Sequence, residues 1–113
     1  MLPNEDRTRL QHMLDAAEKA VRFAEGKTRD SLDSDEQLEL SIVWLLEIVG
    51  EAAKCVGREV REANPSVEWK GIAGTRDRLI HGYFDVDLDI VWSIIQDDLP
   101  VLVKQLWDIL KES

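Results

Sequence analysis

The chain has 113 residues, of which 44% are hydrophobic, 33% are charged and three are prolines. These proportions are typical of one folded domain with a single core, and they argue against a disordered chain. The formal net charge of −9 argues against a protein that binds nucleic acid through a general positive field, and we expect no DNA partner. A small cationic site built from a few side chains remains compatible with this charge.

The sequence predicts a cytoplasmic protein that is not associated with a membrane. Cys55 is the only cysteine, so it cannot form an intramolecular disulfide, which fits a reducing compartment. Residues 3–9 are already charged, unlike a signal peptide, and no apolar run approaches the ~20 residues of a membrane span. From its length and composition, we expect one domain over residues 1–113.

Apolar residues at three- and four-residue spacing predict a first helix that starts at an N-cap, Asn4, and stops at Gly26. They are Leu10, Met13, Leu14, Ala17, Val21 and Ala24. His12 projects from the opposite side and has no second metal ligand one turn away. It is expected to be a solvated surface residue.

A second helix is predicted after a polar turn, with Asp33 or Ser34 as its N-cap. Its main apolar stripe comprises Leu38, Ile42, Leu45, Val49, Ala52, Ala53 and Val56. A further apolar set covers much of the remaining circumference: Leu40, Val43, Trp44, Leu46 and Ile48. A helix that is apolar nearly all round is buried by more than one neighbour, and we expect a second subunit to supply one. The polar edge holds Glu47 and Glu51, but without any Glu-x-x-His pair we expect no metal centre.

The rest of the chain predicts two more principal helices. Residues 58–63 form a short helical turn, and a third helix begins near Trp69 after the break at Pro65. The last helix begins at Asp85 or Asp87, and Pro100 kinks or divides it. It carries a narrow apolar stripe and a second one containing Ile90, Ile94 and Val101. We therefore predict an all-α, up-and-down bundle of four to five helices that forms a homodimer.

Uncommon residue types gather at the end of the third predicted helix, in residues 76–83. On a continuous helix from Trp69, Arg76 falls inside the apolar stripe, where it must pair with a carboxylate or line a crevice. Asp77 and His81 are four residues apart, so they would share one flank of that helix. Asp77 could then fix the tautomer of His81 and leave its other ring nitrogen free for proton transfer. Arg78 adds positive charge, and Tyr83 follows the flexible Gly82.

A histidine beside fixed arginines suits phosphodiester cleavage without a metal ion. The histidine would act on a 2′-hydroxyl, and a guanidinium would hold the phosphate. One histidine cannot be base and acid at once, but a two-fold dimer would supply a second copy. Spacing alone leaves structural roles open: Arg76 could pair with Glu47 or Glu51, and Asp77 with His81 could be an ordinary surface pair.

At these residues the chain resembles the HEPN superfamily, and more narrowly the HepT toxins with their pattern Arg-x4-His-x-Tyr. Arg76, Asp77, His81 and Tyr83 occupy every position of that pattern. The resemblance extends over nearly the whole chain. It includes residues 48–53, the Pro65 break before Trp69, and residues 83–87 leading to 91–92 and 98–100.

The resemblance implies a helical, dimeric, metal-independent RNase that is the toxin of a toxin–antitoxin pair and needs no cofactor. Its partner would be an MntA-like minimal nucleotidyltransferase, with which it could form a larger hetero-oligomer. That antitoxin would silence it by transferring AMP onto the motif tyrosine, Tyr83. By position, Arg76 and His81 would be catalytic, Asp77 would support them, and Arg78 is added by our own inference.

Two other functions remain open from the sequence. The chain could be a non-catalytic nucleotide- or substrate-binding subunit of a neighbouring nucleotidyltransferase, which its strong acidity slightly favours. It could also be a purely structural dimerisation domain.

Overall fold

The protein is a helical bundle, and its computed structural model describes residues 2–82 and 85–112. The long helices are α1 (Asn4–Ala24), α3 (Glu36–Cys55) and α8 (Leu99–Glu112). The shorter helices are α2 (Ser31–Ser34), α4 (Arg58–Ala63), α5 (Trp69–Ala73), α6 (Thr75–Leu79) and α7 (Leu88–Ser93). A π-helical turn, η1 (Ile94–Asp98), joins α7 to α8, and strands β1 (Ile80–His81) and β2 (Asp85–Val86) form a small hairpin.

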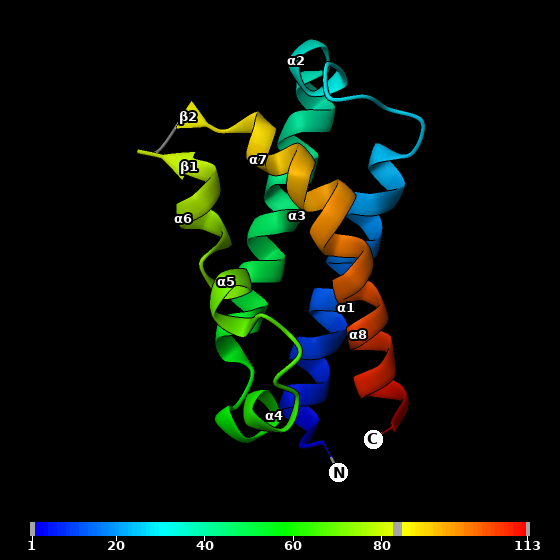
Figure 1. The fold of residues 1–113 in the computed structure, drawn as a ribbon, viewed down its shortest axis with the longest axis vertical. Helices are drawn as coiled ribbons and strands as arrows, with labels where there is room; N and C mark the ends of the chain where they lie inside the picture. The colour runs from blue at the N-terminus through cyan, green and yellow to red at the C-terminus, as the bar shows by residue number, and fades with distance from the viewer. Residues whose placement is uncertain (1, 83–84, 113) are drawn as a thin grey trace.

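The chain runs up α1, down α3, up through α5 and α6, and down through α7, η1 and α8 (Figure 1). Both ends of the described chain therefore lie at the same end of the bundle. This arrangement confirms the predicted all-α, up-and-down bundle, to which the hairpin is an addition. None of the described helices is both long and apolar enough to cross a membrane.

Helix α1 buries the predicted apolar stripe, with Leu10, Met13 and Ala17 fully covered and Val21 half-buried. The predicted N-cap is wrong, because the helix already includes Asn4 and its first bond runs from the Arg7 amide to the Pro3 carbonyl, 2.9 Å. Asp6 has a different role: its carboxylate accepts a 2.6 Å hydrogen bond from the Gly57 amide. This bond ties α1 to the start of α4.

Helix α3 is the central element, and all seven residues of its predicted main stripe are buried. Its N-cap is Asp35, whose side chain accepts from the Leu38 amide at 3.1 Å. The predicted caps, Asp33 and Ser34, are wrong because both residues belong to the preceding turn, α2. Gly50 lets α5 approach closely, since a Cβ at this position would lie 3.0 Å from the Ile72 carbonyl oxygen.

The last helical segment is divided, as predicted from Pro100, but the division precedes the proline. Asp87 caps α7 by accepting from the Asp89 and Ile90 amides, and the helix then widens into η1 before α8 begins. Pro100 has no amide hydrogen, and its ring clashes with the carbonyl four residues earlier. The wider turn over η1 accommodates this defect without ending the helix.

Candidate active site

The motif residues lie on α6 and the hairpin that follows it. Arg76, Asp77 and Arg78 are on α6, His81 is in β1, and all four side chains are exposed. Tyr83 lies outside the described residues. The structure thus brings the two predicted catalytic residues to one edge of the bundle, at the end of α6 shown in Figure 1.

The predicted core-facing position of Arg76 is wrong. The third helix is broken at Gly74, with φ −89° and ψ 10°, so the phase of α5 does not continue into α6. Leu79 takes the core position instead and is 0% exposed. In the described part of the chain, the Arg76 side chain makes no hydrogen bond or ion pair, and Glu51 pairs with Lys54 at 3.1 Å. The structure therefore does not form the Arg76–Glu51 or Arg76–Glu47 pair that spacing had left open.

The predicted helical flank shared by Asp77 and His81 is also wrong. Helix α6 ends at Leu79, and Ile80 is extended, with φ −117° and ψ 121°. Because the chain leaves the helix before His81, the four-residue spacing no longer stacks the two side chains. No hydrogen bond joins them among the described residues.

A carboxylate that the sequence analysis missed lies opposite His81. In the hairpin, His81 is paired with Asp85 and Ile80 with Val86. Residues directly opposite on antiparallel strands have Cβ atoms about 4.5–5.5 Å apart. Gly82, with φ 78°, allows the turn between them. The Asp87 amide donates a 2.7 Å hydrogen bond to the Leu79 carbonyl. This bond joins the residue that follows β2 to the end of α6.

Arg78 faces the last helical segment. Its guanidinium lies 3.8 Å from the Asp98 carboxylate on η1, and both side chains are about half exposed. Exposed pairs of this kind contribute about 0–1 kcal/mol. Arg78 is therefore held loosely.

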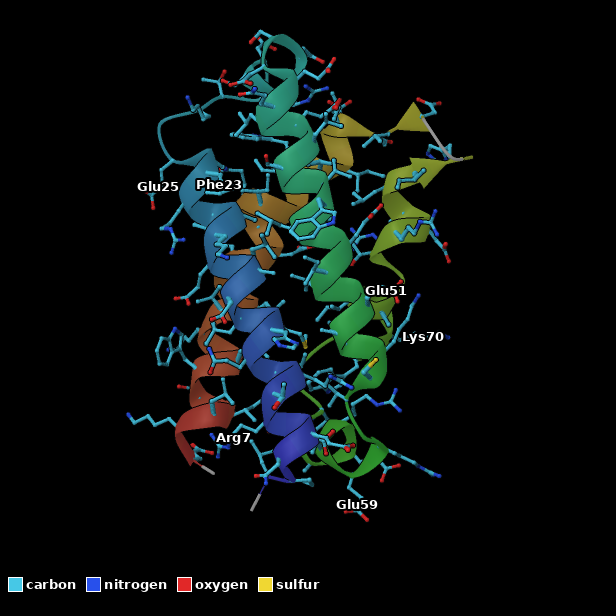
Figure 2. The ribbon with its side chains drawn as sticks, turned by 180° about the vertical axis from the view of Figure 1, so that it is seen from behind. Arg7, Phe23, Glu25, Glu51, Glu59 and Lys70 are labelled. Carbon is cyan, nitrogen blue, oxygen red and sulfur yellow. The ribbon has the colours of Figure 1, made fainter. Side chains whose placement is uncertain are left out.

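Only part of the apolar excess predicted on the second helix lies at the surface of α3, because Val43 and Leu46 are buried within the chain. Leu40 and Trp44, one turn apart, are 58% and 62% exposed. Seen from behind, α3 lies between α1 and the α5–α6 segment (Figure 2). Trp44 lines a groove of about 360 Å³ together with Arg9, His12 and Glu51. His12 is exposed, as predicted.

The described residues contain no group of three or more histidines, cysteines, aspartates or glutamates arranged to hold a metal ion. The polar edge of α3 near Glu47 and Glu51 is thus not assembled as a metal site in the described chain. Cys55, at the end of that edge, is an exposed free thiol.

Comparison with known proteins places these features in one family. A family model described as Ribonuclease HepT-like matches residues 13–109, which include the whole motif segment. The chain is 40% identical over 103 residues to "Putative RNase TTE0752" of Caldanaerobacter subterraneus subsp. tengcongensis, covering 91% of this chain and 92% of that protein. It is 32% identical over 93 residues to "Probable ribonuclease HepT" of Thermococcus cleftensis, covering 82% and 84% of the two chains. No solved structure gives a significant match.

Proposed function

Because this chain belongs to the ribonuclease HepT-like family, we propose that it is an endoribonuclease that cleaves RNA without a metal ion and acts as the toxin of a toxin–antitoxin pair. The observation that carries this proposal is the family match over residues 13–109, within which Arg76 and His81 stand exposed at one edge of the bundle. Exposure suits a polymer substrate, which must reach both side chains from solvent.

The reaction needs a proton acceptor, a proton donor and a cation at the phosphate. The imidazole of His81 takes the proton of the RNA 2′-hydroxyl, whose oxygen attacks the neighbouring phosphorus. The bond from phosphorus to the 5′-oxygen breaks, that oxygen receives a proton, and a 2′,3′-cyclic phosphate remains. Arg76 binds the non-bridging oxygens as their negative charge increases, and Arg78 adds positive charge nearby. Asp77 has the supporting role that its position in the motif implies.

Activity should therefore survive removal of divalent cations. Purified protein incubated with RNA in excess EDTA is expected to give fragments that end in 2′,3′-cyclic phosphate and begin with a 5′-hydroxyl. Mass spectrometry of the fragments identifies both ends. Absence of cleavage, or cleavage that only added Mg²⁺ restores, would contradict the proposed mechanism.

A second copy of the chain would supply the second histidine. We place the two-fold contact on the exposed face of α3, because Leu40 and Trp44 are apolar and α3 packs against α6. A two-fold axis across this face, directed toward the α6 edge, would bring both copies of α6 to one side of the dimer.

Trp44→Asp is expected to convert the dimer to a monomer and to lower RNA cleavage at least about tenfold, because a charge there opposes apolar burial. Light scattering and a cleavage assay measure the two effects. Trp107→Asp is the matched control, since Trp107 on α8 is also exposed, at 53%. A wild-type monomer, or a dimer that only Trp107→Asp dissociates, would overturn this interface.

The proposed antitoxin is an MntA-like nucleotidyltransferase that transfers AMP to Tyr83, within a dimer or a larger hetero-oligomer. Tyr83 follows His81 by two residues, so an AMP group there would add bulk and negative charge where RNA phosphate must bind.

Co-expression with such a nucleotidyltransferase is expected to increase the intact mass by whole AMP units and to abolish cleavage. Tyr83 is the only tyrosine, so Tyr83→Phe should remove the increment. An unchanged mass, or an increment that persists in Tyr83→Phe, would exclude this regulation.

The alternative function is a non-catalytic subunit that binds nucleotide or substrate for the nucleotidyltransferase. The formal charge of −9 favours it, because an acidic chain repels RNA, which carries many phosphates, more strongly than a single nucleotide. Nucleotide binding that persists in His81→Ala, without any RNA product from wild type, would support this alternative.

A further inference from the structure

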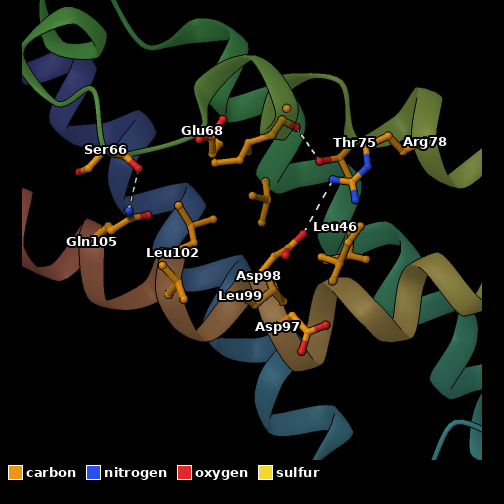
Figure 3. Close-up of a pocket in the computed structure, with 15 residues that line it drawn as sticks. Leu46, Ser66, Glu68, Thr75, Arg78, Asp97, Asp98, Leu99, Leu102 and Gln105 are labelled. Atoms are coloured by element: carbon orange, nitrogen blue, oxygen red, sulfur yellow. Dashed lines mark hydrogen bonds and ion pairs between the residues drawn. The ribbon is translucent and has the colours of Figure 1, made fainter.

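A pocket of about 380 Å³ lies between the α5–α6 segment and the η1–α8 segment, with α3 beneath it. Figure 3 shows its lining side chains converging from these three parts of the fold. Its volume lies in the usual range of sites for small molecules. Arg76 and His81 do not line it, and Arg78 is the one motif residue that it shares with the candidate active site.

Two polar bridges join the same pair of walls at opposite ends of the pocket. At one end the Gln105 side-chain amide donates to the Ser66 carbonyl at 3.0 Å, and at the other Arg78 pairs with Asp98 at 3.8 Å. Figure 3 shows both bridges, with Leu102 and Leu99 between them. The pocket therefore has defined ends as well as a floor.

The floor between the bridges is apolar. It is built from Leu46, Val49, Ile72, Ile94, Leu99 and Leu102. Five of these are buried, and Ile72 is half-buried. An apolar ring or branched chain would replace water on this surface, which favours binding.

The rim of the pocket is acidic. Glu68, Asp97 and Asp98 line it, against one cation, Arg78. Asp97 accepts a long hydrogen bond from the Ser93 hydroxyl, 3.4 Å, and its carboxylate is otherwise open to solvent. Three carboxylates with one guanidinium attract a cation and repel an anion. The long, exposed Arg78–Asp98 pair is weak enough for a bound ammonium group to replace.

We propose that this pocket binds a small organic cation, an ammonium or amidinium group on an aromatic or branched apolar body. The apolar body lies on the floor, and the cationic group takes the place of Arg78 at Asp98, beside Asp97. This site shares Arg78 with the proposed RNase site, but binding of the cation does not depend on the proposed RNase function.

The experiment titrates the intact protein with 2-phenylethylamine by calorimetry and ligand-observed NMR, up to about 10 mM, as is suitable for a ligand of this size. Saturable binding of one molecule per chain is expected. The neutral analogue 2-phenylethanol should bind at least about tenfold more weakly, and the anion 3-phenylpropanoate weaker still. No saturable binding, or equal binding of the alcohol, would overturn the proposal.

Variants separate this site from a general attraction of cations to an acidic protein. The double variant Asp97→Asn with Asp98→Asn should weaken binding about tenfold, and Arg78→Gln should strengthen it about threefold by removing the competing cation. Asp108→Asn, an exposed position on α8 outside the pocket, is the control and should change nothing. Weaker binding in Arg78→Gln, or an equal loss in Asp108→Asn, would show that the proposed contacts do not hold the ligand. Because binding is measured without RNA, the result is independent of whether the chain is a ribonuclease.

Discussion

His81→Ala is expected to abolish RNA cleavage and leave the fold intact. A positioned general acid or base contributes about 10²–10⁴-fold to a rate, so at least a hundredfold loss is expected. The imidazole is exposed and makes no hydrogen bond in the described chain, so its removal should change the free energy of unfolding by only about ±0.5 kcal/mol. Cleavage kinetics and denaturant unfolding measure the two quantities.

The chain supplies a matched control for this substitution. His12 on α1 is the only other histidine and is also exposed. His12→Ala should retain wild-type cleavage and stability. If His81→Ala cleaves RNA as fast as His12→Ala, His81 is not the catalytic base or acid. If the variant instead unfolds, the loss of activity carries no information about chemistry.

In the hairpin Asp85 is paired opposite His81, where the sequence had led us to expect a helical contact from Asp77. The sequence could not reveal this pairing, because two-residue strands are too short to show an alternating pattern. Only the turn glycine, Gly82, gave a local indication.

The long helices and their buried faces could be predicted because their periodicity extends over several turns. Leu10 and Met13 on α1, and Ile42 and Val49 on α3, are all buried as expected. Residues 58–63 were also correctly placed, since Gly57 and Pro65 delimit them. Such patterns average over many positions, so one irregular residue does not obscure them.

The candidate site depended on features that last only one or two residues. Gly74 breaks the third helix and rotates Arg76 out of the predicted core stripe, although glycine is often tolerated within helices. The continuous helix predicted from Trp69 was therefore correct for α5 and wrong for α6. The family could be identified from the resemblance, whereas the contacts around the motif required the fold.

Leu79→Ala is expected to lower the free energy of unfolding far more than His81→Ala does, because Leu79 anchors α6 and the hairpin to the core. Its side chain is 0% exposed, and its carbonyl accepts the 2.7 Å bond from Asp87. Truncating a fully buried leucine costs about 2–5 kcal/mol through lost apolar burial and the cavity that remains. Natural domains of this size are stable by about 5–15 kcal/mol, so the variant should fold with a clearly lower denaturant midpoint.

Leu106→Ala separates this anchoring from a general loss of stability. Leu106 is also 0% exposed but lies in α8, outside the segment that carries the motif. Both variants should unfold at lower denaturant concentration than wild type. Under conditions in which both are fully folded, only Leu79→Ala should slow RNA cleavage, because only that cavity lets α6 and β1 shift relative to the bundle. Equal cleavage by the two variants would mean that Leu79 stabilises the fold without positioning Arg76 and His81, and that the geometry of the site is maintained by the hairpin alone.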